Sequence, residues 1–542
     1  MKTLHGQKAS PGIAIGKIHY IERREIDTSA HTVSDTQKEL DRVEQAVQEA
    51  VRQLDKLHSV ALEKMTSEEA ELFEVHSMML TDLDYRDSIT NIITEEKVNA
   101  ESAVSRTADI FAQMFLDMEK DYMQSRAADV RDVSTRLLNV LQGRTGFELS
   151  AKEPVIVAAD DLSPSETVQM DKNLVLALIT SGGSVNSHTA IFARNMGIPA
   201  VVALGSSLDE SCGGKEAVVD GHGAVLYLEP DRETAEKWSV SYNNEKKEKA
   251  ALAALKGMPA RTLDNREIKL FANIGNPSDA DSVLENDAEG IGLYRSEFIF
   301  LESRDYPTEE QQYIAYRKVV EKMKGRQVII RTLDIGADKQ ADYFKLPREE
   351  NPALGLRALR ICLTRPDIFI TQLRAIYRSS AHGSVAIMFP MVASLWELRE
   401  AREIAAKVRA QLKAENIPFS AQVPLGIMIE TPAAALMSDE LAKEADFFSV
   451  GTNDLTQYTL AVDRGNNALG RFTDTHHPAL LKLLELTAKN AKQAGIPIGV
   501  CGELGADREL TRFFIKIGIH ELSVPPPQIL PLRKFIREMK VD

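Results

Sequence analysis

Cysteine is scarce in this sequence, and long hydrophobic runs are missing. The 542 residues include three cysteines, Cys212, Cys362 and Cys501, which lie far apart. Their spacing and odd number exclude a disulfide framework and a CxxC metal site, and they fit a reducing compartment. No stretch approaches the roughly 18 apolar residues of a membrane-spanning helix. The first residues have no apolar signal core, so we expect a cytoplasmic protein.

Positive charge is also in deficit. Lys and Arg number 65 against 80 Asp and Glu, which gives a net charge of -15. This charge disfavours nucleic acid or an anionic membrane as the main partner and suits a basic protein partner. Acidity that serves only solubility explains the charge equally well. The length predicts about two to four domains.

Proline is absent from residues 34 to 141, and this span has helical periodicity. Apolar residues recur there at alternating spacings of three and four. They are Leu40, Val43, Val47, Ala50, Leu54, Leu57 and Ala61. Such a seam is typical of a coiled-coil-like bundle, and the whole span predicts about four helices, two of them in a long hairpin. A bundle used only for interaction or dimerisation would have the same pattern.

One segment of this span, residues 68–80, combines acidic residues with the methionine pair Met78 and Met79. Methionine adapts to a partner surface, and carboxylates steer a basic partner. Core filling by the two methionines is equally compatible with their spacing.

The composition on both sides of the helical span is that of an α/β domain. Residues 10–20 predict a turn and a strand, and strand-like runs recur further along. These runs are residues 154–159, 174–179, 200–203 and 217–221. We therefore place one α/β domain at residues 1–30 and 145–229, with a helical domain inserted at 31–144. The charged, alanine-rich residues 230–262 predict a linker helix.

Residues 263–542 alternate buried strands with helices. Eight candidate strands alternate with helices within about 280 residues, and this number and length predict a (β/α)8 barrel. The strands are residues 268–272, 290–293, 327–331, 385–389, 425–429, 447–450, 496–500 and 521–524. In such barrels the chemistry takes place at the carboxyl ends of the strands.

Charged side chains follow these strands repeatedly. The cations are Arg295, Arg331, Lys339, Arg357 and Arg464. Together they suit a small, multiply anionic ligand, because arginine pairs bidentately with phosphate and carboxylate. Glu430 and Asp454, with the Asn453 amide nearby, suit a hard cation such as Mg2+. One such charge alone would more often be a salt bridge or a solvated group, and it is their repetition at strand ends that favours a site.

Cys501 follows the seventh strand, and no histidine or other base stands beside it in the sequence. A buried structural thiol and a thiol that donates a proton to a carbanion are both compatible with this position.

A glycine pair precedes His188. The apolar run 174–179, the pair Gly182-Gly183 and the helical pattern after residue 187 predict a strand, a turn and a helix. Backbone N–H groups and the helix dipole favour an anion at such a helix start. An imidazole there can attack phosphorus and hold a phosphoryl group. A lone histidine near a turn is more often a surface or capping residue.

Several motifs resemble those of the phosphoenolpyruvate-utilising enzymes, over essentially the whole chain. They are residues 10–16 (SPGIAIG), 73–80 (FEVHSMML), 126–132 (RAADVRD), 292–298 (GLYRSEF), 331–336 (RTLDIG), 426–432 (GIMIETP) and 448–458 (FSVGTNDLTQY). The resemblance implies a multidomain α/β protein. It would consist of a swivelling α/β phosphohistidine domain with an inserted all-α bundle, followed by a (β/α)8 barrel of the TIM type that binds phosphoenolpyruvate.

The resemblance also implies roles for individual residues. His188 would become the phosphohistidine intermediate, and Cys501 would donate the proton that completes pyruvate. Glu430 and Asp454 would hold Mg2+. The residues that would bind phosphoenolpyruvate are Arg295, Arg331, Arg357, Arg464 and Asn453.

Within this family, the motifs are most similar to the branch that serves the bacterial sugar phosphotransferase system. In that branch the phosphoryl group passes to a histidine of the small carrier protein HPr, which docks on the helical insert, as the first step of sugar uptake. The resemblance implies a docking surface made of Glu68, Glu74, His76, Met78, Met79 and Arg126. It also implies a homodimer formed through the barrel domain.

The sequence departs from the family in the turn before His188. The usual order is Gly-Gly, one residue, then Thr-Ser-His. Here Asn186 takes the place of the threonine and Ser184 that of the second glycine. The change alters the turn and the transfer rate if residue 184 needs a positive φ, which serine adopts reluctantly. Asparagine can still hydrogen-bond an imidazole or a phosphate, so we expect phosphorylation to survive.

Two other kinds of protein compete with this interpretation. Pyruvate phosphate dikinase and phosphoenolpyruvate synthase need a nucleotide-grasping domain ahead of the histidine, where this chain has a helical insert without a Gly-rich phosphate loop. A non-catalytic regulatory or scaffold protein could keep the fold. The histidine, the cysteine, the two carboxylates and the arginines are all present, which argues against it.

Overall fold

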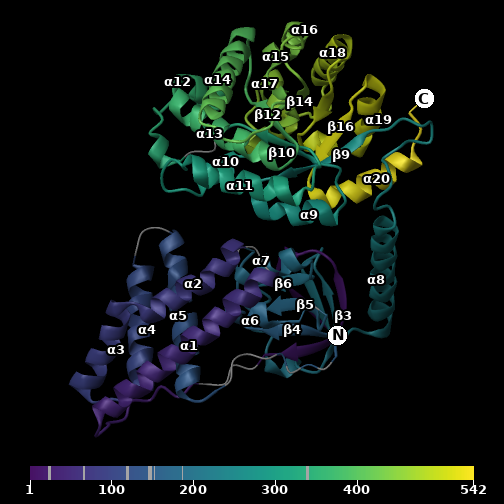
Figure 1. Ribbon diagram of the computed structural model, residues 1–542. Helices are drawn as coiled ribbons and strands as arrows, with labels where there is room; N and C mark the ends of the chain where they lie inside the picture. Colours follow the sequence, from purple (N-terminus) through teal and green to yellow (C-terminus); the bar gives the residue numbers. More distant parts are fainter. Residues whose placement is uncertain are drawn as a thin grey trace. The chain divides into compact units, whose positions relative to one another are not determined.

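The computed structural model describes residues 1–21, 26–64, 67–117, 121–144, 149, 151, 153–171, 173–185, 187–336, 341–464 and 466–541. At residues 62–64, 67–69, 121–125, 188, 195 and 467 it describes the backbone alone. The chain divides into two compact units, Met1–Lys249 and Ala250–Asp542 (Figure 1).

The first unit contains an eight-stranded sheet. Its order is β1 (Lys2–His5), β8 (Val225–Leu228), β7 (Glu216–Asp220), β3 (Ile13–Tyr20), β4 (Val155–Ala159), β5 (Val175–Thr180), β6 (Ala200–Val202) and β2 (Gln7–Ser10). The central strands β3, β4, β5 and β6 are parallel, and the outer strands pair antiparallel. Their apolar runs are buried, as parallel strands covered on both faces require.

The helical span lies between two neighbouring strands of this sheet. β3 precedes it and β4 follows it, yet the two strands pair directly, with Ile18 opposite Ile156. The helices are α1 (Thr36–Lys64), α2 (Ser67–Thr81), α3 (Leu83–Glu96), α4 (Ala100–Leu116) and α5 (Asp121–Leu141), and Figure 1 shows them side by side. The helical bundle is therefore an insertion in the connection between β3 and β4.

The described part of the bundle has five helices, one more than the pattern predicts. The reason lies at Asp82, whose extended backbone ends α2 and whose carboxylate accepts the Tyr85 N–H at 3.1 Å to begin α3. Such a cap needs no proline or glycine, so periodicity alone does not reveal it. The apolar seam of α1 is confirmed: Val47, Ala50 and Leu54 are all buried against the other helices.

Three more helices complete the first unit. α6 (Pro164–Gln169) follows β4, and α7 (His188–Met196) follows β5. α8 (Arg232–Ala253) crosses the boundary between the units and has no buried residue. One of its faces is half-buried, and on that face Trp238 contacts the Tyr227 ring of β8, with 5.5 Å between the ring centroids.

The second unit contains a closed barrel, as predicted. Its strands are β9 (Lys269–Ile274), β10 (Ile291–Arg295), β11 (Val328–Arg331), β12 (Val385–Phe389), β13 (Leu425–Ile429), β14 (Phe448–Val450), β15 (Ile498–Val500) and β16 (Glu521–Val524). Each strand is parallel to the next, and β16 closes on β9. The fold is thus a multidomain α/β architecture ending in a TIM-type barrel.

Helices cover the outside of the barrel (Figure 1). They are α9 (Ala280–Glu285), α10 (Glu297–Leu301), α11 (Glu309–Lys322), α12 (Leu359–Thr364), α13 (Pro366–Ser379), α14 (Leu395–Ala414), α15 (Pro432–Leu436), α16 (Ser438–Leu441), α17 (Thr452–Leu460), α18 (Pro478–Ala494), α19 (Arg508–Ile517) and α20 (Ile529–Glu538). The large core lies between strands and helices, and a smaller apolar cluster that includes Phe447 and Cys501 also forms among residues of the barrel strands. Among the described helices, none combines the length and the apolar character needed to cross a membrane.

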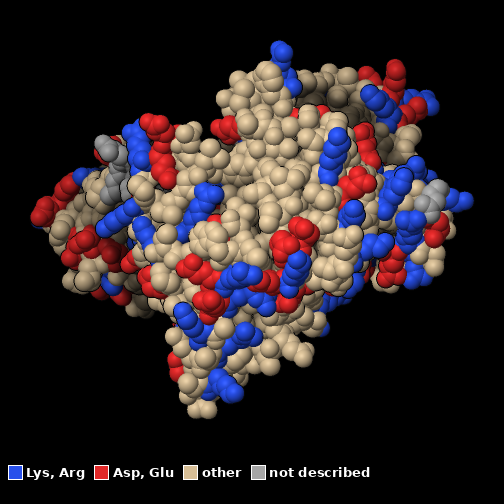
Figure 2. Space-filling model, turned by 90° about the horizontal axis from the view of Figure 1, so that it is seen from above, with Lys and Arg blue, Asp and Glu red and all other residues tan. Residues whose placement is uncertain are grey.

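Charge is dispersed over the surface. Figure 2 shows acidic and basic side chains interspersed on the face that it draws, rather than gathered by sign. The net charge of -15 therefore does not by itself mark a docking surface on that face.

The seam of α1 yields a stability prediction. Leu54 is fully buried, so Leu54→Ala should lower the free energy of unfolding of the first unit by about 2–5 kcal/mol. Leu83, which is 73% exposed, is the matched control, and Leu83→Ala should change it by less than about 0.5 kcal/mol. Urea unfolding followed by circular dichroism measures both. Equal losses would contradict the assignment of the seam as core.

Candidate active site

The carboxyl ends of the barrel strands bring the predicted residues together. Arg331 is the last residue of β11, and Glu430 directly follows β13. Asp454 lies in the first turn of α17, after β14, and Cys501 follows β15. Because all eight strands are parallel, these positions share one mouth of the barrel.

Arg331 is held inside this mouth by two carboxylates. Its Nη2 lies 2.6 Å from Glu297 Oε1 and 2.8 Å from Asp334 Oδ2. Burial alone would lower the pKa of Arg331, but the Asp334 and Glu297 carboxylates hold that pKa above its usual value. The guanidinium is therefore a permanent buried charge.

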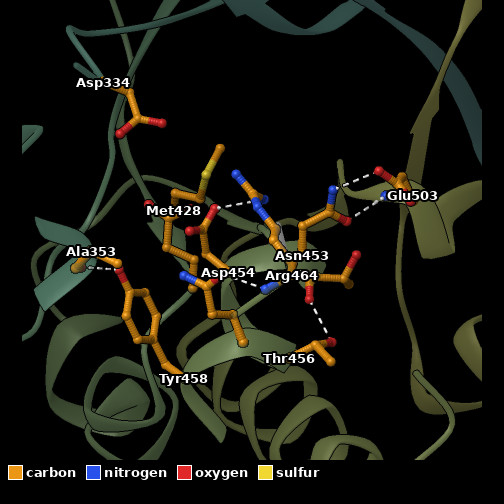
Figure 3. Close-up of polar contacts among 12 residues, drawn as sticks. Asp334, Ala353, Met428, Asn453, Asp454, Thr456, Tyr458, Arg464 and Glu503 are labelled. Carbon is orange, nitrogen blue, oxygen red and sulfur yellow. Dashed lines mark hydrogen bonds and ion pairs between the residues drawn. The ribbon is translucent and has the colours of Figure 1, made fainter. Parts of the chain in front are cut away.

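Two further arginines flank Asp454, and Figure 3 shows one of them, Arg464, beside this carboxylate. Arg357 Nη1 lies 3.3 Å from Asp454 Oδ1, and Arg464 Nη1 lies 3.4 Å from Oδ2. Arg357 also pairs with Asp334 at 2.9 Å and donates to the Tyr458 hydroxyl at 3.0 Å. Arg357 is 3% exposed, whereas Arg464 is exposed, so one is fixed and the other is open to solvent.

Glu430 is buried in a negative environment. Burial, together with the nearby Asp454 and Asp334 carboxylates, raises the pKa of Glu430 to about 8. Its Oε1 accepts the Met391 N–H at 2.6 Å. A Cβ at position 451 would lie 2.8 Å from Glu430 Oε2, so Gly451 leaves the room that the carboxylate occupies.

The donor set fits a hard divalent cation. The described residues contain no group of three or more His, Cys, Asp or Glu side chains arranged to hold a metal. Mg2+, however, usually takes one or two protein carboxylates and completes its shell with water and substrate oxygens. Glu430 and Asp454 offer such a pair, and a cation beside them would relieve the repulsion that raises the pKa of Glu430.

Cys501 is buried beneath the mouth. It is 3% exposed, and its thiol lies 3.5 Å from the Val450 carbonyl oxygen. Burial raises the pKa of Cys501 to about 11, although the Arg331 and Arg295 charges act in the opposite direction. At neutral pH the group is a thiol that still carries its proton.

Asn453 faces another strand end. Its Nδ2 donates to Glu503 Oε1 at 3.0 Å, and its Oδ1 accepts the Glu503 N–H at 3.1 Å (Figure 3). Arg295, at the end of β10, is half-buried. Lys339 lies outside the described residues.

Three further residues belong to this mouth. Glu297 and Asp334, which follow β10 and β11, neutralise Arg331. Tyr458 had no signal of its own apart from its position four residues after Asp454, which puts both on one face of α17.

The turn before His188 has the predicted form, with one correction. His188 is the first residue of α7, and the Ser187 hydroxyl caps this helix by accepting the Ala190 N–H at 3.4 Å. The left-handed conformation falls on Gly183, with φ of 83°, and Ser184 does not have a positive φ. The loss of a glycine at position 184 therefore costs no backbone strain. Asn186 lies outside the described residues.

The segment with the methionine pair presents some of its residues outward. Met78 is 63% exposed on α2, Glu74 is exposed, and Met79 is half-buried. His76 points the other way and is 1% exposed, because the helical period that exposes residues 74 and 78 turns residue 76 inward. The side chain of Glu68 lies outside the described residues.

Buried His76 faces α5. Its ring nitrogens lie 3.6 Å from Asp129 Oδ1 and 3.8 Å from Asp132 Oδ2. Burial would raise the pKa of Asp129, but His76 and Arg126 hold it below its usual value. The Ser165 hydroxyl of α6 donates to Asp132 at 2.9 Å. A polar chain thus connects the helix that carries Met78 to the connection between β4 and β5.

Comparison with known proteins gives matches over the whole chain. The family models described as PEP-utilising enzyme match as the N-terminal region at residues 5–126, the mobile domain at 151–223 and the PEP-binding domain at 249–541. Among curated relatives, the phosphoenolpyruvate-protein phosphotransferase of Priestia megaterium is 40% identical over 99% of this chain and 94% of its own length. That of Bacillus subtilis is 38% identical over 99% and 95%.

A solved structure is also similar to part of the chain. An NMR solution structure of Enzyme I (nEIt) is 33% identical over 45% of this chain and 99% of its own length, with a TM-score of 0.41.

The buried ion pairs of the mouth yield a second prediction. Arg331→Met should lower the free energy of unfolding of the second unit by about 3–5 kcal/mol, because it leaves buried carboxylates without their cation. The control is Arg399→Met, which removes an ion pair between exposed Arg399 and Glu444 and should leave the unfolding midpoint nearly unchanged. Urea midpoints of the two variants give the comparison. An Arg331 variant as stable as the Arg399 variant would show that the pairs do not constrain the mouth.

Proposed function

Since this chain belongs to the family of phosphoenolpyruvate-utilising enzymes, we propose that it moves the phosphoryl group of phosphoenolpyruvate to His188 and then to a histidine of the carrier protein HPr. The chain is a phosphotransferase that acts with phosphoenolpyruvate, as its relatives are named. The proposal adds the acceptors, the release of pyruvate and the residues that take part.

The observation that carries the proposal is the charge arrangement of the barrel mouth. Arg331 and Arg357 are buried cations, Arg464 is an exposed one, and Glu430 and Asp454 are carboxylates beside them. Phosphoenolpyruvate has a phosphate and a carboxylate on a three-carbon frame, and each anionic group suits a guanidinium. Arg295 and Asn453 complete the set of substrate-binding residues at neighbouring strand ends.

Mg2+ held by Glu430 and Asp454 would neutralise charge on the phosphoryl oxygens. The protein's part is then positioning and charge stabilisation, as in other phosphoryl transfers. The exposed Arg464 reaches Asp454 from the solvent side, so it can exchange that carboxylate for substrate at little desolvation cost.

The chemical step uses two residues of this chain, one as the nucleophile and one as the proton donor. The imidazole Nε2 of His188 forms a bond to phosphorus, and the bond between phosphorus and the enol oxygen breaks. The enolate that leaves takes a proton at its methylene carbon and becomes pyruvate. Cys501 is suited to supply that proton, because its raised pKa keeps the thiol protonated at neutral pH. The thiolate then recovers a proton from solvent.

Delivery to the carrier uses the helical insert. Exposed Met78 and Glu74 on α2 combine an adaptable apolar contact with a carboxylate that suits a basic partner. Buried His76 supports α2 from beneath through Asp129, and Met79, Arg126 and Glu68 belong to the same proposed surface.

The proposal assigns one role to each part of the chain. Residues 1–30 and 145–229 carry His188, and residues 31–144 bind HPr. Residues 230–262 form the linker, and residues 263–542 bind phosphoenolpyruvate. The active form would be a homodimer through the barrel domain, in the cytoplasm.

Labelling with radioactive phosphoenolpyruvate tests the acceptor. The full chain with Mg2+ should take up label, and His188→Ala should abolish it. The matched control is His222→Ala, which changes a half-exposed histidine of the same unit and should leave labelling unchanged. Labelled ATP should give none. Label that survives in the His188 variant, or that comes from ATP, would overturn the proposal.

Introduction of a charge on α2 tests the carrier surface. Met78→Asp should slow transfer to HPr at least about tenfold, because it puts a carboxylate into an apolar contact, while labelling from phosphoenolpyruvate stays unchanged. Val240→Asp on α8, at a residue that is 60% exposed, is the control. Stopped-flow or quench measurements of transfer from the labelled chain to HPr give the rates. Unchanged transfer in the Met78 variant would remove α2 from the docking surface.

A further inference from the structure

A cavity of about 510 Å3 opens at the amino-terminal end of the barrel, away from the proposed mouth. Its lining includes Lys269, the first residue of β9, and Phe447 and His520, which directly precede β14 and β16. The residues proposed to act on phosphoenolpyruvate lie at the other ends of the same strands. This cavity therefore has no part in the function described above.

The cavity exists because small residues line this end of the barrel. Barrel interiors are ordinarily filled by bulky branched side chains. Here Gly499 and Ser449 line the space, and a Cβ at Gly292 would lie 2.4 Å from Glu521 Oε1. The glycines thus make room for the Glu521 side chain to turn toward the inside. The volume is within the range of small-molecule sites.

Two carboxylates, Asp446 and Glu521, line the cavity, and they differ in their contacts. Among the described residues, no hydrogen bond and no ion pair reaches the Glu521 carboxylate. Burial raises the pKa of Glu521 to about 8, and the neighbouring Glu289 carboxylate acts in the same direction. Lys269 acts against this shift without forming an ion pair, and its side chain is exposed at the rim.

We propose that this cavity binds a small organic amine whose ammonium group pairs with Glu521 and whose apolar body lies against Phe447 and Ile329. Phe447 and Ile329 are both buried, and both line the cavity. An apolar wall with one convergent charged group is the usual composition of a small-molecule site.

The charge around the cavity favours a cation over an anion. Burial and the nearby Glu289 carboxylate both raise the pKa of Glu521, and Lys269 acts in the opposite direction. Asp446 at the rim is already compensated, because it accepts the Leu425 N–H at 2.7 Å and lies 3.8 Å from Arg402 Nη1. His520 is exposed and accepts the Ile498 N–H at 3.4 Å through Nδ1. An ammonium group would give Glu521 the ion pair that no described residue provides.

A ligand in this cavity would touch the apolar cluster that also surrounds Cys501. Phe447 and Ile329 belong to one buried cluster with Met428 and Cys501. Met428 Sδ in turn accepts from Arg331 at 3.8 Å. The two ends of the barrel therefore share one packed interior. A ligand that shifts Phe447 or Ile329 would also shift their neighbours at the mouth.

Calorimetry with phenethylamine on the full chain tests the proposal. Binding at pH 7 should release up to about 0.9 proton per amine, because a carboxyl with a pKa of about 8 is mostly protonated there and the ammonium displaces that proton. Titration in two buffers of different ionisation enthalpy counts the proton. Glu521→Gln should weaken binding at least about tenfold and abolish the release. Glu289→Gln, which changes a neighbouring carboxylate outside the lining, is the control and should keep binding within about threefold.

Each alternative result overturns the proposal. Equal binding by the Glu521 and Glu289 variants would place the amine elsewhere. Binding of 3-phenylpropionate in preference to phenethylamine would make the cavity an anion site. Absence of any heat with the wild-type chain up to high millimolar amine would leave the cavity without this ligand class. The wild-type measurements stand even if a variant does not fold.

Discussion

The second unit depends on one constraint, the convergence of like charges at the carboxyl ends of the barrel strands. The Asp454 and Asp334 carboxylates raise the pKa of buried Glu430, and Arg331 acts against this shift from within the same mouth. Arg331 and Arg357 both pair with Asp334. Burying such a set costs desolvation energy that a core of apolar residues would avoid. The proposed ligands, a doubly anionic substrate and a divalent cation, would use both signs of charge and so account for this arrangement.

The first unit depends on a different constraint, which is the direct pairing of β3 with β4. This pairing fixes the sheet although more than a hundred residues of chain separate the two strands. The helical bundle is therefore attached at one place, and the contact between Asp132 and Ser165 of α6 ties it to the segment before β5 and α7. The proposed docking surface on α2 and the proposed phosphorylation site at the start of α7 are thus joined by a short path of packed elements.

Much of this could be predicted from the sequence, because strand and helix periods are local. The ranges 385–389, 425–429 and 521–524 are strands with the predicted bounds, and the strand-end charges do meet at one mouth. What could not be predicted depends on packing across long separations. Three features depend on neighbours in space, which sequence periodicity does not identify. They are the ion pair of Arg357 with Asp334, the burial of His76 and the positive φ at Gly183. The cavity beside Glu521 is of the same kind, since it arises where glycines on other strands leave space.

The apolar cluster among the barrel strands links these features. A cysteine can serve as a proton donor only if its thiol keeps its proton at neutral pH, and burial raises the pKa of Cys501 further above neutrality against the opposing arginine charges. Met428 and Phe447 of the same cluster help to bury the thiol, and Phe447 also lines the cavity at the opposite end. The acidity of Cys501 is therefore set by packing that extends through the barrel. A residue or ligand that loosens Phe447 would admit water and lower the pKa of the thiol, even though it lies far from any group that contacts substrate.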